Sequence, residues 1–202
     1  MSAPEPASPL SAHMQPGRLG TDGSTPVRLS ERRVAIAQVM GRKGRDGARD
    51  GALRAAISGA LGLDLPPAGG SAATGLTTAI WIAPETWLIL RDGPPSDDFA
   101  RELMAACGEA ASIVDQSSGK SVVRLSGARA RDVLAKGCRI DLHPRVFGPG
   151  KSAVTPIAHI HAVLMQVDAA PTFDLIVPST LARDFVEWLG LSAAEFGYEI
   201  VA

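Results

Sequence analysis

Short runs of β-forming residues joined by tight turns recur along this chain, and they constrain its fold more than any other feature. Four such runs stand out, the first two with a turn at their centre: residues 78–92 around Pro84–Glu85, residues 113–127 around Ser118–Gly119, residues 154–167 and residues 172–179. Because tight turns join antiparallel neighbours, we expect an antiparallel or mixed sheet.

Helical periodicity separates these strands. A further strand at residues 34–40 precedes four expected helices, which lie within residues 46–61, 96–108, 126–137 and 181–189. The expected end signals are the capping serines Ser96 and Ser126 and the terminating glycines Gly62, Gly108 and Gly137. The order of elements predicts an α+β fold in which the helices pack on one side of the sheet.

The beginning of the chain differs from the rest in composition. Residues 1–28 predict a disordered arm, since they contain Pro4, Pro6, Pro9, Pro16 and Pro26. They lack the continuous apolar stretch of a signal peptide. Residues 29–202 are expected to form a single domain, because 202 residues with 46% hydrophobic side chains can build one core. No run of about 18 apolar residues could span a bilayer, so we expect a soluble protein without a membrane partner.

Charge and cysteine content exclude several classes of protein. Lys and Arg number 20 against 21 Asp and Glu, and a net charge of -1 supplies no long-range field that would attract nucleic acid. The two cysteines, Cys107 and Cys138, cannot form a disulfide framework and belong to no C-x-x-C pair. We therefore expect no nucleic-acid partner and a reducing, cytoplasmic location.

Few side chains suggest chemistry. His159 and His161 stand two apart in an expected strand, so they share a face and are candidate metal ligands. A metal site needs further ligands, and an exposed or interface position is the favoured reading of this pair. No glycine-rich segment matches G-x-G-x-x-G or a complete phosphate loop, and no acid, base and nucleophile converge. We expect no catalytic residue, no cofactor and no resident metal in this chain.

The three tryptophans are candidate anchors of the core or of an interface. Trp81 and Trp87 flank the turn at Pro84–Glu85, and Trp188 lies on the apolar stripe of the last expected helix. Aromatic residues make up only 4% of the chain, so these three do not form a stacking platform for bases.

Ordered segments across residues 29–197 resemble the gamma subunit family of heterotetrameric sarcosine oxidase. They are GALGLDLPPAGGSA, TAIWIAPETWLIL, the continuous stretch from IVDQSSGKSVVRLSG to KSAVTPIAHI, and FDLIVPSTLARDFVEWLGLSAAEFG. The middle part also resembles the folate-binding aminomethyltransferases, which pair a D-x-S hairpin with a G-x-x-A-x-x-x-L helix, here represented by Asp115, Ser117, Gly127, Ala130 and Leu134. This second resemblance implies a folate-binding aminomethyltransferase-like domain and makes Asp115, Ser117 and Lys120 candidate folate-pocket residues.

The first resemblance implies an accessory, non-catalytic gamma subunit. Its complex would demethylate sarcosine oxidatively to glycine, transfer the one-carbon unit to tetrahydrofolate and produce hydrogen peroxide. It implies alpha and beta partners that carry FAD, FMN, NAD and folate sites, and zinc in a delta partner. The alternative is a stand-alone folate-binding protein of the aminomethyltransferase type, which would use the DQSSGK hairpin, residues 115–120, as its pocket.

Overall fold

The structure is a computed structural model that describes residues 8–22, 26–42 and 48–201. The described strands form two sheets. The seven-stranded sheet consists, from edge to edge, of β1 (Gly17–Leu19), β12 (Tyr198–Ile200), β2 (Val27–Arg32), β8 (Lys120–Ser126), β11 (Thr172–Pro178), β10 (Ile160–Asp168) and β9 (Ser152–Ile157). The five-stranded sheet consists of β4 (Ser71–Thr74), β5 (Thr77–Ala83), β6 (Thr86–Asp92), β3 (Val34–Gly41) and β7 (Ala111–Asp115).

Most neighbouring strands are antiparallel, as the hairpins require. The exception among the described strands is the pair of β12 and β2, which runs parallel. The described helices are α1 (Ala48–Leu61), α2 (Asp98–Cys107), α3 (Ala130–Ala135) and α4 (Ala182–Ala193), with short 3₁₀ turns at Gly108–Ala110, Ser179–Leu181 and Ala194–Phe196. The predicted α+β fold is confirmed, but its strands divide into two sheets rather than one.

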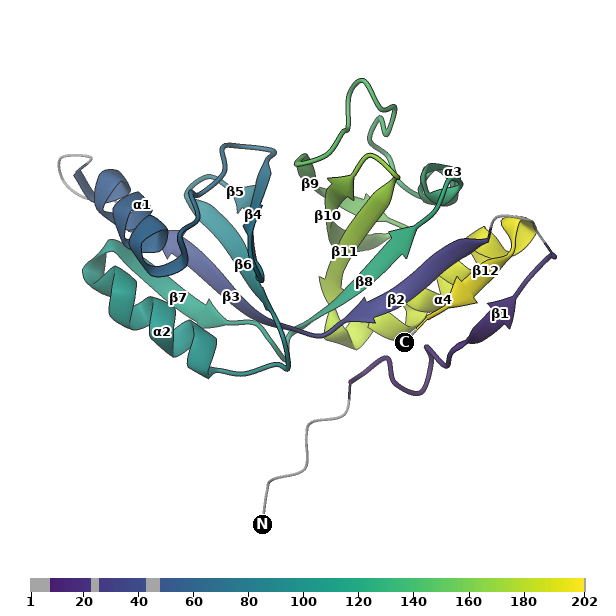
Figure 1. Ribbon diagram of the computed structural model, residues 1–202, viewed down its shortest axis with the longest axis horizontal. Coiled ribbons are helices and arrows are strands. Elements are labelled where there is room, and N and C mark those ends of the chain that lie inside the picture. Colours follow the sequence, from purple (N-terminus) through teal and green to yellow (C-terminus); the bar gives the residue numbers. More distant parts are fainter. Residues whose placement is uncertain (1–7, 23–25, 43–47, 202) are drawn as a thin grey trace, which may run out of the picture.

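The chain crosses between the sheets twice at one place (Figure 1). Arg33 alone separates β2 from β3, so one nearly continuous strand serves both sheets. The return crossing is the turn at residues 116–119 between β7 and β8. We call the region where these two crossings meet the seam.

The two faces of each sheet have different partners. On the five-stranded sheet, Trp87 and Ile89 of β6 pack with α1 and α2, whereas the alternate residues Leu88 and Leu90 pack against the seven-stranded sheet. Both faces of β6 are therefore buried, which explains its continuous apolar sequence. On the seven-stranded sheet, α3 and α4 cover the outer face through a cluster that includes Phe185. Helices thus lie on both outer surfaces, not on one side of a single sheet.

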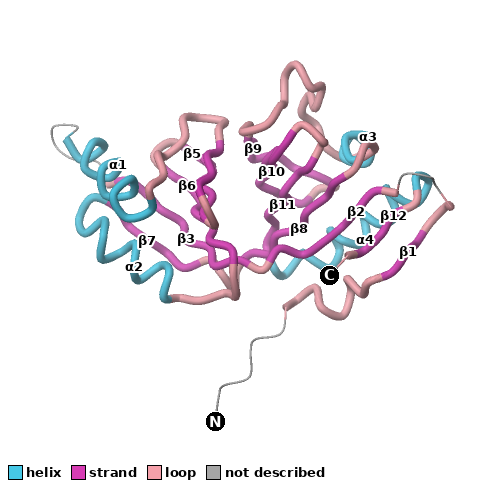
Figure 2. The backbone as a smooth tube through the Cα atoms, viewed as in Figure 1, coloured by secondary structure: helices cyan, strands magenta, loops and turns pink. Residues whose placement is uncertain are grey.

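Helix ends follow the sequence signals in part. The Ser96 hydroxyl accepts the Asp98 N–H at 3.1 Å, and α2 stops at Gly108, whose φ is +51°. The prediction that Ser126 caps a helix is wrong, because Ser126 ends β8 and α3 begins at Ala130. Figure 2 shows the long loop that follows α3 projecting from the body of the protein before β9.

The prediction of a disordered arm is wrong for residues 8–22. Leu10 is fully buried and Met14 is 9% exposed, and both belong to the core between the seven-stranded sheet and its helices. Residues Gly17–Leu19 form β1 and pair with β12. Burial of these two apolar residues and the pairing of β1 with β12 hold this proline-containing segment on the domain. The remaining residues of the predicted arm, 1–7 and 23–25, lie outside the described part of the chain.

Candidate functional site

A network of ion pairs closes one part of the seam. Asp174 of β11 is fully buried and accepts hydrogen bonds from two arginines, Arg32 Nη1 at 2.5 Å and Arg124 at 2.8 and 3.0 Å. Arg32 also donates to Asp92 at the end of β6. Arg32 therefore links the two sheets electrostatically, and hydrogen bonding to Asp174 raises the pKa of Arg124 despite partial burial.

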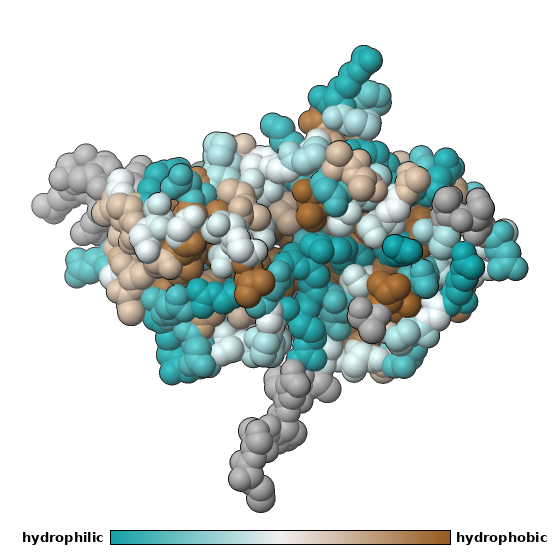
Figure 3. Space-filling model, viewed as in Figure 1, coloured by the Kyte–Doolittle hydropathy of each residue, from teal (hydrophilic) through white to brown (hydrophobic). Residues whose placement is uncertain are grey.

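Figure 3 shows hydrophilic residues gathered across the middle of the face in view, with apolar residues on both sides. Because Asp174 has three hydrogen bonds and two cationic partners, its burial is compensated within the protein. The network is thus structural, because its donors and its acceptor already bind one another. We call this network the clasp.

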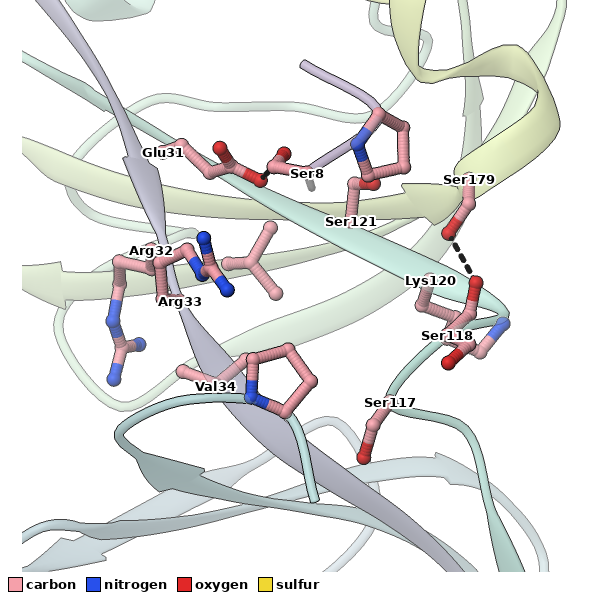
Figure 4. Close-up of a pocket in the computed structure, with 13 residues that line it drawn as sticks. Ser8, Glu31, Arg32, Arg33, Val34, Ser117, Ser118, Lys120, Ser121 and Ser179 are labelled. Carbon is pink, nitrogen blue, oxygen red and sulfur yellow. Dashed lines mark hydrogen bonds between the residues drawn. The ribbon is translucent and has the colours of Figure 1, made fainter. Parts of the chain in front are cut away.

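A small cavity opens beside this clasp, where the two crossings meet (Figure 4). Its volume is about 180 Å³, and we call it the seam pocket. Its lining comes from the start of the described chain, the β2–β3 crossing, the residues before α2, the β7–β8 crossing with the start of β8, and the 3₁₀ turn after β11: Ser8, Pro9, Glu31, Arg32, Arg33, Val34, Pro95, Ser117, Ser118, Lys120, Ser121, Val122 and Ser179.

Two of the three predicted folate-pocket residues, Asp115 and Ser117, form hydrogen bonds that hold the two crossings together. The Ser117 hydroxyl accepts the backbone N–H of Ile36 in β3 at 2.9 Å and donates to Asp115 Oδ1 at 2.6 Å. Asp115 Oδ1 also accepts the Ser117 N–H at 3.1 Å. Ser117 lines the seam pocket, whereas Asp115 does not. This hydrogen-bonded turn holds the second crossing against the first.

The third predicted residue, Lys120, has a different environment. Lys120 is half-buried, and desolvation lowers the pKa of its ammonium group. Its neighbour Ser121 is 5% exposed, and the Ser121 Oγ has no hydrogen-bond partner within the described residues. The Lys120 ammonium likewise has no hydrogen bond or ion pair with the described residues. The seam pocket therefore contains two polar groups that the described protein leaves unpaired.

The two candidate metal ligands lie in different elements. His159 does not lie in a strand as predicted, because Ala158 and His159 form the two-residue turn between β9 and β10 with φ values of +49° and +70°. His161 is exposed in β10. Within residues 8–22, 26–42 and 48–201, no group of three or more His, Cys, Asp or Glu side chains is placed to hold a metal ion.

His159 instead shares a shallow depression with residues from two other segments. Cys138, three residues after the end of α3, and Trp188 of α4 line it as well. Burial raises the pKa of the Cys138 thiol, which disfavours the reactive thiolate. Gly137 lies beneath Trp188, since an added Cβ there would be 2.5 Å from Trp188 Cζ2.

The three tryptophans have unequal exposure. Trp87 is 2% exposed and its indole N–H donates to the Pro66 carbonyl at 3.0 Å, so it is a core residue and cannot contact a partner. Trp81 and Trp188 are only partly buried. Trp87 is therefore no longer a candidate interface residue, whereas Trp81 and Trp188 remain candidates.

Sequence reasoning missed Arg32, Asp174 and Ser121. Asp174 carried a usable signal, since it interrupts the otherwise apolar run FDLIV, and a charge there requires a partner. Nothing local distinguishes Ser121.

None of the described helices is long and apolar enough to cross a membrane.

Two sheets joined by a double crossing, with helices on their outer faces, define a protein of the aminomethyltransferase fold. The glycine cleavage system aminomethyltransferase T from Bartonella henselae is similar, with a TM-score of 0.57 over 81% of this chain and 45% of that chain. Sequence identity is 16%, so this likeness shows the fold alone. It confirms the predicted resemblance of the fold.

The particular family follows from closer relatives. Residues 45–195 match the sarcosine oxidase, gamma subunit family. Sarcosine oxidase subunit gamma of an Arthrobacter species is 33% identical over 89% of this chain and 87% of that protein, and the subunit from Corynebacterium sp. strain P-1 is 33% identical with the same coverage. The chain belongs to the sarcosine oxidase gamma subunit family.

A solved structure agrees with this assignment. A chain of the heterotetrameric sarcosine oxidase from Corynebacterium sp. U-96, in complex with pyrrole 2-carboxylate, matches with a TM-score of 0.79 and 27% identity. The match covers 95% of this chain and 96% of that chain. The family resemblance predicted from the ordered sequence segments is thus confirmed.

Proposed function

We propose that this chain is the accessory, non-catalytic gamma subunit of a heterotetrameric sarcosine oxidase. In this role it supports the oxidative demethylation of sarcosine to glycine, with transfer of the one-carbon unit to tetrahydrofolate and production of hydrogen peroxide. The observation that carries the proposal is the match to a chain of the Corynebacterium heterotetramer over 95% of this chain. A similarity that spans both sheets supports the same structural role for the whole fold.

The partners in this proposal are alpha, beta and delta subunits. FAD, FMN and NAD belong to the larger partners and zinc to the delta subunit. The sequence has no dinucleotide fingerprint, and the seam uses Asp115 and Asp174 in structural hydrogen bonds, which supports a bracing role for this chain. A cytoplasmic location is part of the proposal, and the free thiols of Cys107 and Cys138 are consistent with it.

We place one partner contact on α4. Leu181, just before the helix, and Leu191, near its end, are 39% and 78% exposed. Trp188 precedes Leu191 by three residues and therefore neighbours it on the surface of α4, whereas Leu181 belongs to the 3₁₀ turn before the helix. The exposed Leu191 and the partly buried Trp188 form a small apolar patch, and apolar and aromatic residues of this kind are found at the centre of protein interfaces.

Co-purification tests the proposal. The tagged chain, co-expressed with the three partner subunits, is expected to recover all of them, whereas the isolated chain is expected to be colourless and inactive towards sarcosine. Oxidation of sarcosine by the isolated chain would refute the accessory role. Recovery without partner subunits would refute membership in the complex.

A matched pair of variants tests the contact on α4. Leu191→Ser is expected to weaken partner binding by about tenfold or more, since burial of a leucine contributes roughly 1.5–3 kcal/mol. Leu76→Ser is the control, because Leu76 is 66% exposed in the turn between β4 and β5, far along the chain from α4. Equal losses from both variants, or none from Leu191→Ser, would remove α4 as the contact.

The aminomethyltransferase fold favours a second candidate, a stand-alone folate-binding protein. It requires tetrahydrofolate to bind the isolated chain through Ser117 and Lys120, which both line the seam pocket. Micromolar affinity, about 8 kcal/mol, is the expected result for this candidate. Calorimetry without heat, together with an unchanged melting temperature, would eliminate it.

A further inference from the structure

Two depressions lie side by side next to α3. The first is the depression beside His159 and Trp188, with a volume of about 440 Å³, and the second lies between α3 and the loop that follows it, with a volume of about 480 Å³. Ala135 and Cys138 line both depressions. The two therefore form one continuous surface, which we call the outer groove, and Trp188 connects it to the apolar patch on α4.

One wall of the outer groove is a long loop, residues 136–151, that projects from the body of the protein (Figure 2). Leu142 and Phe147 bury their side chains in the core, and Arg131 of α3 donates hydrogen bonds to the carbonyl oxygens of both. Arg131 also donates to the buried Gln166 at 2.8 Å. Connections of this length without a helix or strand are uncommon, and those that are ordered usually carry a function.

The floor of the outer groove is apolar and is fixed by backbone pairing. Cys138 forms a bridge with Ile157 of β9, and the Ala158 N–H donates to the Gly137 carbonyl at 3.3 Å. Cys138 and Ile140 pack against the core beneath α3 and α4, yet both remain partly exposed. A side chain of a partner can therefore cover this floor without any rearrangement of the backbone.

The unpaired charge around the outer groove is positive. Arg139 lines the first depression, and Arg145 lies on the projecting loop. Both are exposed, and neither guanidinium has a hydrogen bond or ion pair with the described residues. The carboxylates that line the groove already have partners, because Asp132 pairs with Arg129 at 3.1 Å and Asp141 accepts a backbone N–H at 2.8 Å. The groove is thus complementary to an acidic surface.

We propose that the outer groove receives an acidic segment of a partner subunit, with an apolar side chain over Cys138 and Ile140 and carboxylates at Arg139 and Arg145. This inference rests on the proposed function, which supplies the partner, and it adds the place and the chemistry of the contact. Hydrogen bonds between arginine and carboxylate are strong and directional. Because the anchored loop is already ordered, binding costs little conformational freedom on this side of the contact.

Protection of Cys138 tests the location of the segment. The full-length chain, alone and in the purified four-subunit complex, is treated with N-ethylmaleimide at pH 8, and the labelled cysteine peptides are quantified by mass spectrometry. We expect Cys138 to react at least about tenfold more slowly in the complex, because thiol reactions depend on access. Cys107 is buried and reports on folding, since it reacts only when the chain unfolds. Equal rates for Cys138 in two folded samples would overturn the proposal.

Charge variants test the chemistry of the segment, also where the isolated chain does not stay folded. Arg139→Gln combined with Arg145→Gln is expected to weaken binding to the partner subunits by about tenfold at about 50 mM salt, and the loss should shrink towards about 1 M salt, where exposed charges are screened. Arg28→Gln combined with Arg101→Gln is the matched control. It removes the same charge from two side chains that are each 64% exposed and lie outside the groove lining.

The outcomes distinguish this inference from the proposed function. If the wild-type chain recovers no partner subunit, both fail. If the wild-type chain assembles and the groove variant binds its partners with equal affinity, only the acidic segment is refuted. Equal losses in the groove variant and the control variant would indicate a general effect of net charge and would also overturn the inference.

Discussion

Replacement of Asp174 by Asn tests whether the seam depends on its buried charge. Asp174 is fully buried and accepts three hydrogen bonds, one from Arg32 and two from Arg124. Asn has nearly the same shape but no charge, and its amide would turn a donor towards an arginine. Removal of one partner from a buried ion pair costs roughly 3–5 kcal/mol. Because Arg124 remains 34% exposed and can turn towards water, we take the lower end, about 3 kcal/mol.

This loss can be measured as a change in melting temperature. For a chain of about 200 residues, 1 kcal/mol corresponds to roughly 2–4 °C, so Asp174→Asn should lower Tm by about 6–12 °C. Thermal unfolding followed by circular dichroism measures the shift. Asp184→Asn, an exposed aspartate in the first turn of α4, is the control and should change stability by less than about 0.5 kcal/mol. Equal melting temperatures for the two variants would refute the reasoning.

A double-mutant cycle identifies the partner that makes Asp174 important. If the cost arises from uncompensated arginines, Arg124→Met should reduce the further loss caused by Asp174→Asn, giving a coupling energy of roughly 0.5–3 kcal/mol. Strictly additive losses would show that Asp174 acts through something other than Arg124.

Three further predictions concern other positions. Gly137→Ala should lower stability by about 1–3 kcal/mol and change tryptophan fluorescence, because the added Cβ would meet Trp188 at 2.5 Å; wild-type fluorescence and stability would contradict this. Lys120→Met should raise Tm at pH 7. Burial lowers the pKa of Lys120 in the folded chain, so wild-type stability increases as pH rises towards 10.5. The difference in Tm between Lys120→Met and the wild type should therefore become smaller. A difference in Tm that stays constant between about pH 7 and 10 would argue against burial as the cause. Burial raises the pKa of both thiols, so a thiol reagent at neutral pH should modify Cys138 slowly, faster as pH rises, and Cys107 only on unfolding; rapid reaction of Cys107 in the folded chain would contradict its burial.

The elements of the fold could be predicted because their signals are local. The hairpin turn at Pro84–Glu85 was correctly located, and Gly62 and Gly108 end α1 and α2 with positive φ. The predicted hairpin around Ser118–Gly119 is wrong, because the turn there joins β7 and β8, which belong to different sheets and do not pair with each other. The division into two sheets could not be predicted in this way. The run from Trp87 to Leu90 is apolar at every position, so periodicity does not show which partner each face meets.

Composition misled the prediction for the beginning of the chain. Prolines and small residues dominate it, and such composition usually indicates disorder. Leu10 and Met14 nevertheless fill places in the core, and β1 pairs with β12 near the other end of the chain. Two buried side chains in a polar segment leave almost no trace in average composition.

The residues of the candidate site also divide into those that a local sequence signal identified and those that it did not. Asp115 and Ser117 were identified because a D-x-S turn has a local signature, although their hydrogen bonds prove structural. The pairing of Arg32 with Asp174 joins positions 142 residues apart, and no local pattern specifies it. The strand order β2–β8–β11 in the seven-stranded sheet brings them together.

By itself, the sequence determined most of the strands, the helices and the family of this protein, because turn residues, helical stripes and ordered segments are read along the chain. The tertiary structure decided that the strands form two sheets, that Trp87 is core, and that Lys120 and Ser121 meet one cavity. The physical reason is that burial and charge pairing depend on which distant segments pack together. For the same reason, the unpaired Ser121 hydroxyl became recognisable only once its surroundings in the fold were known.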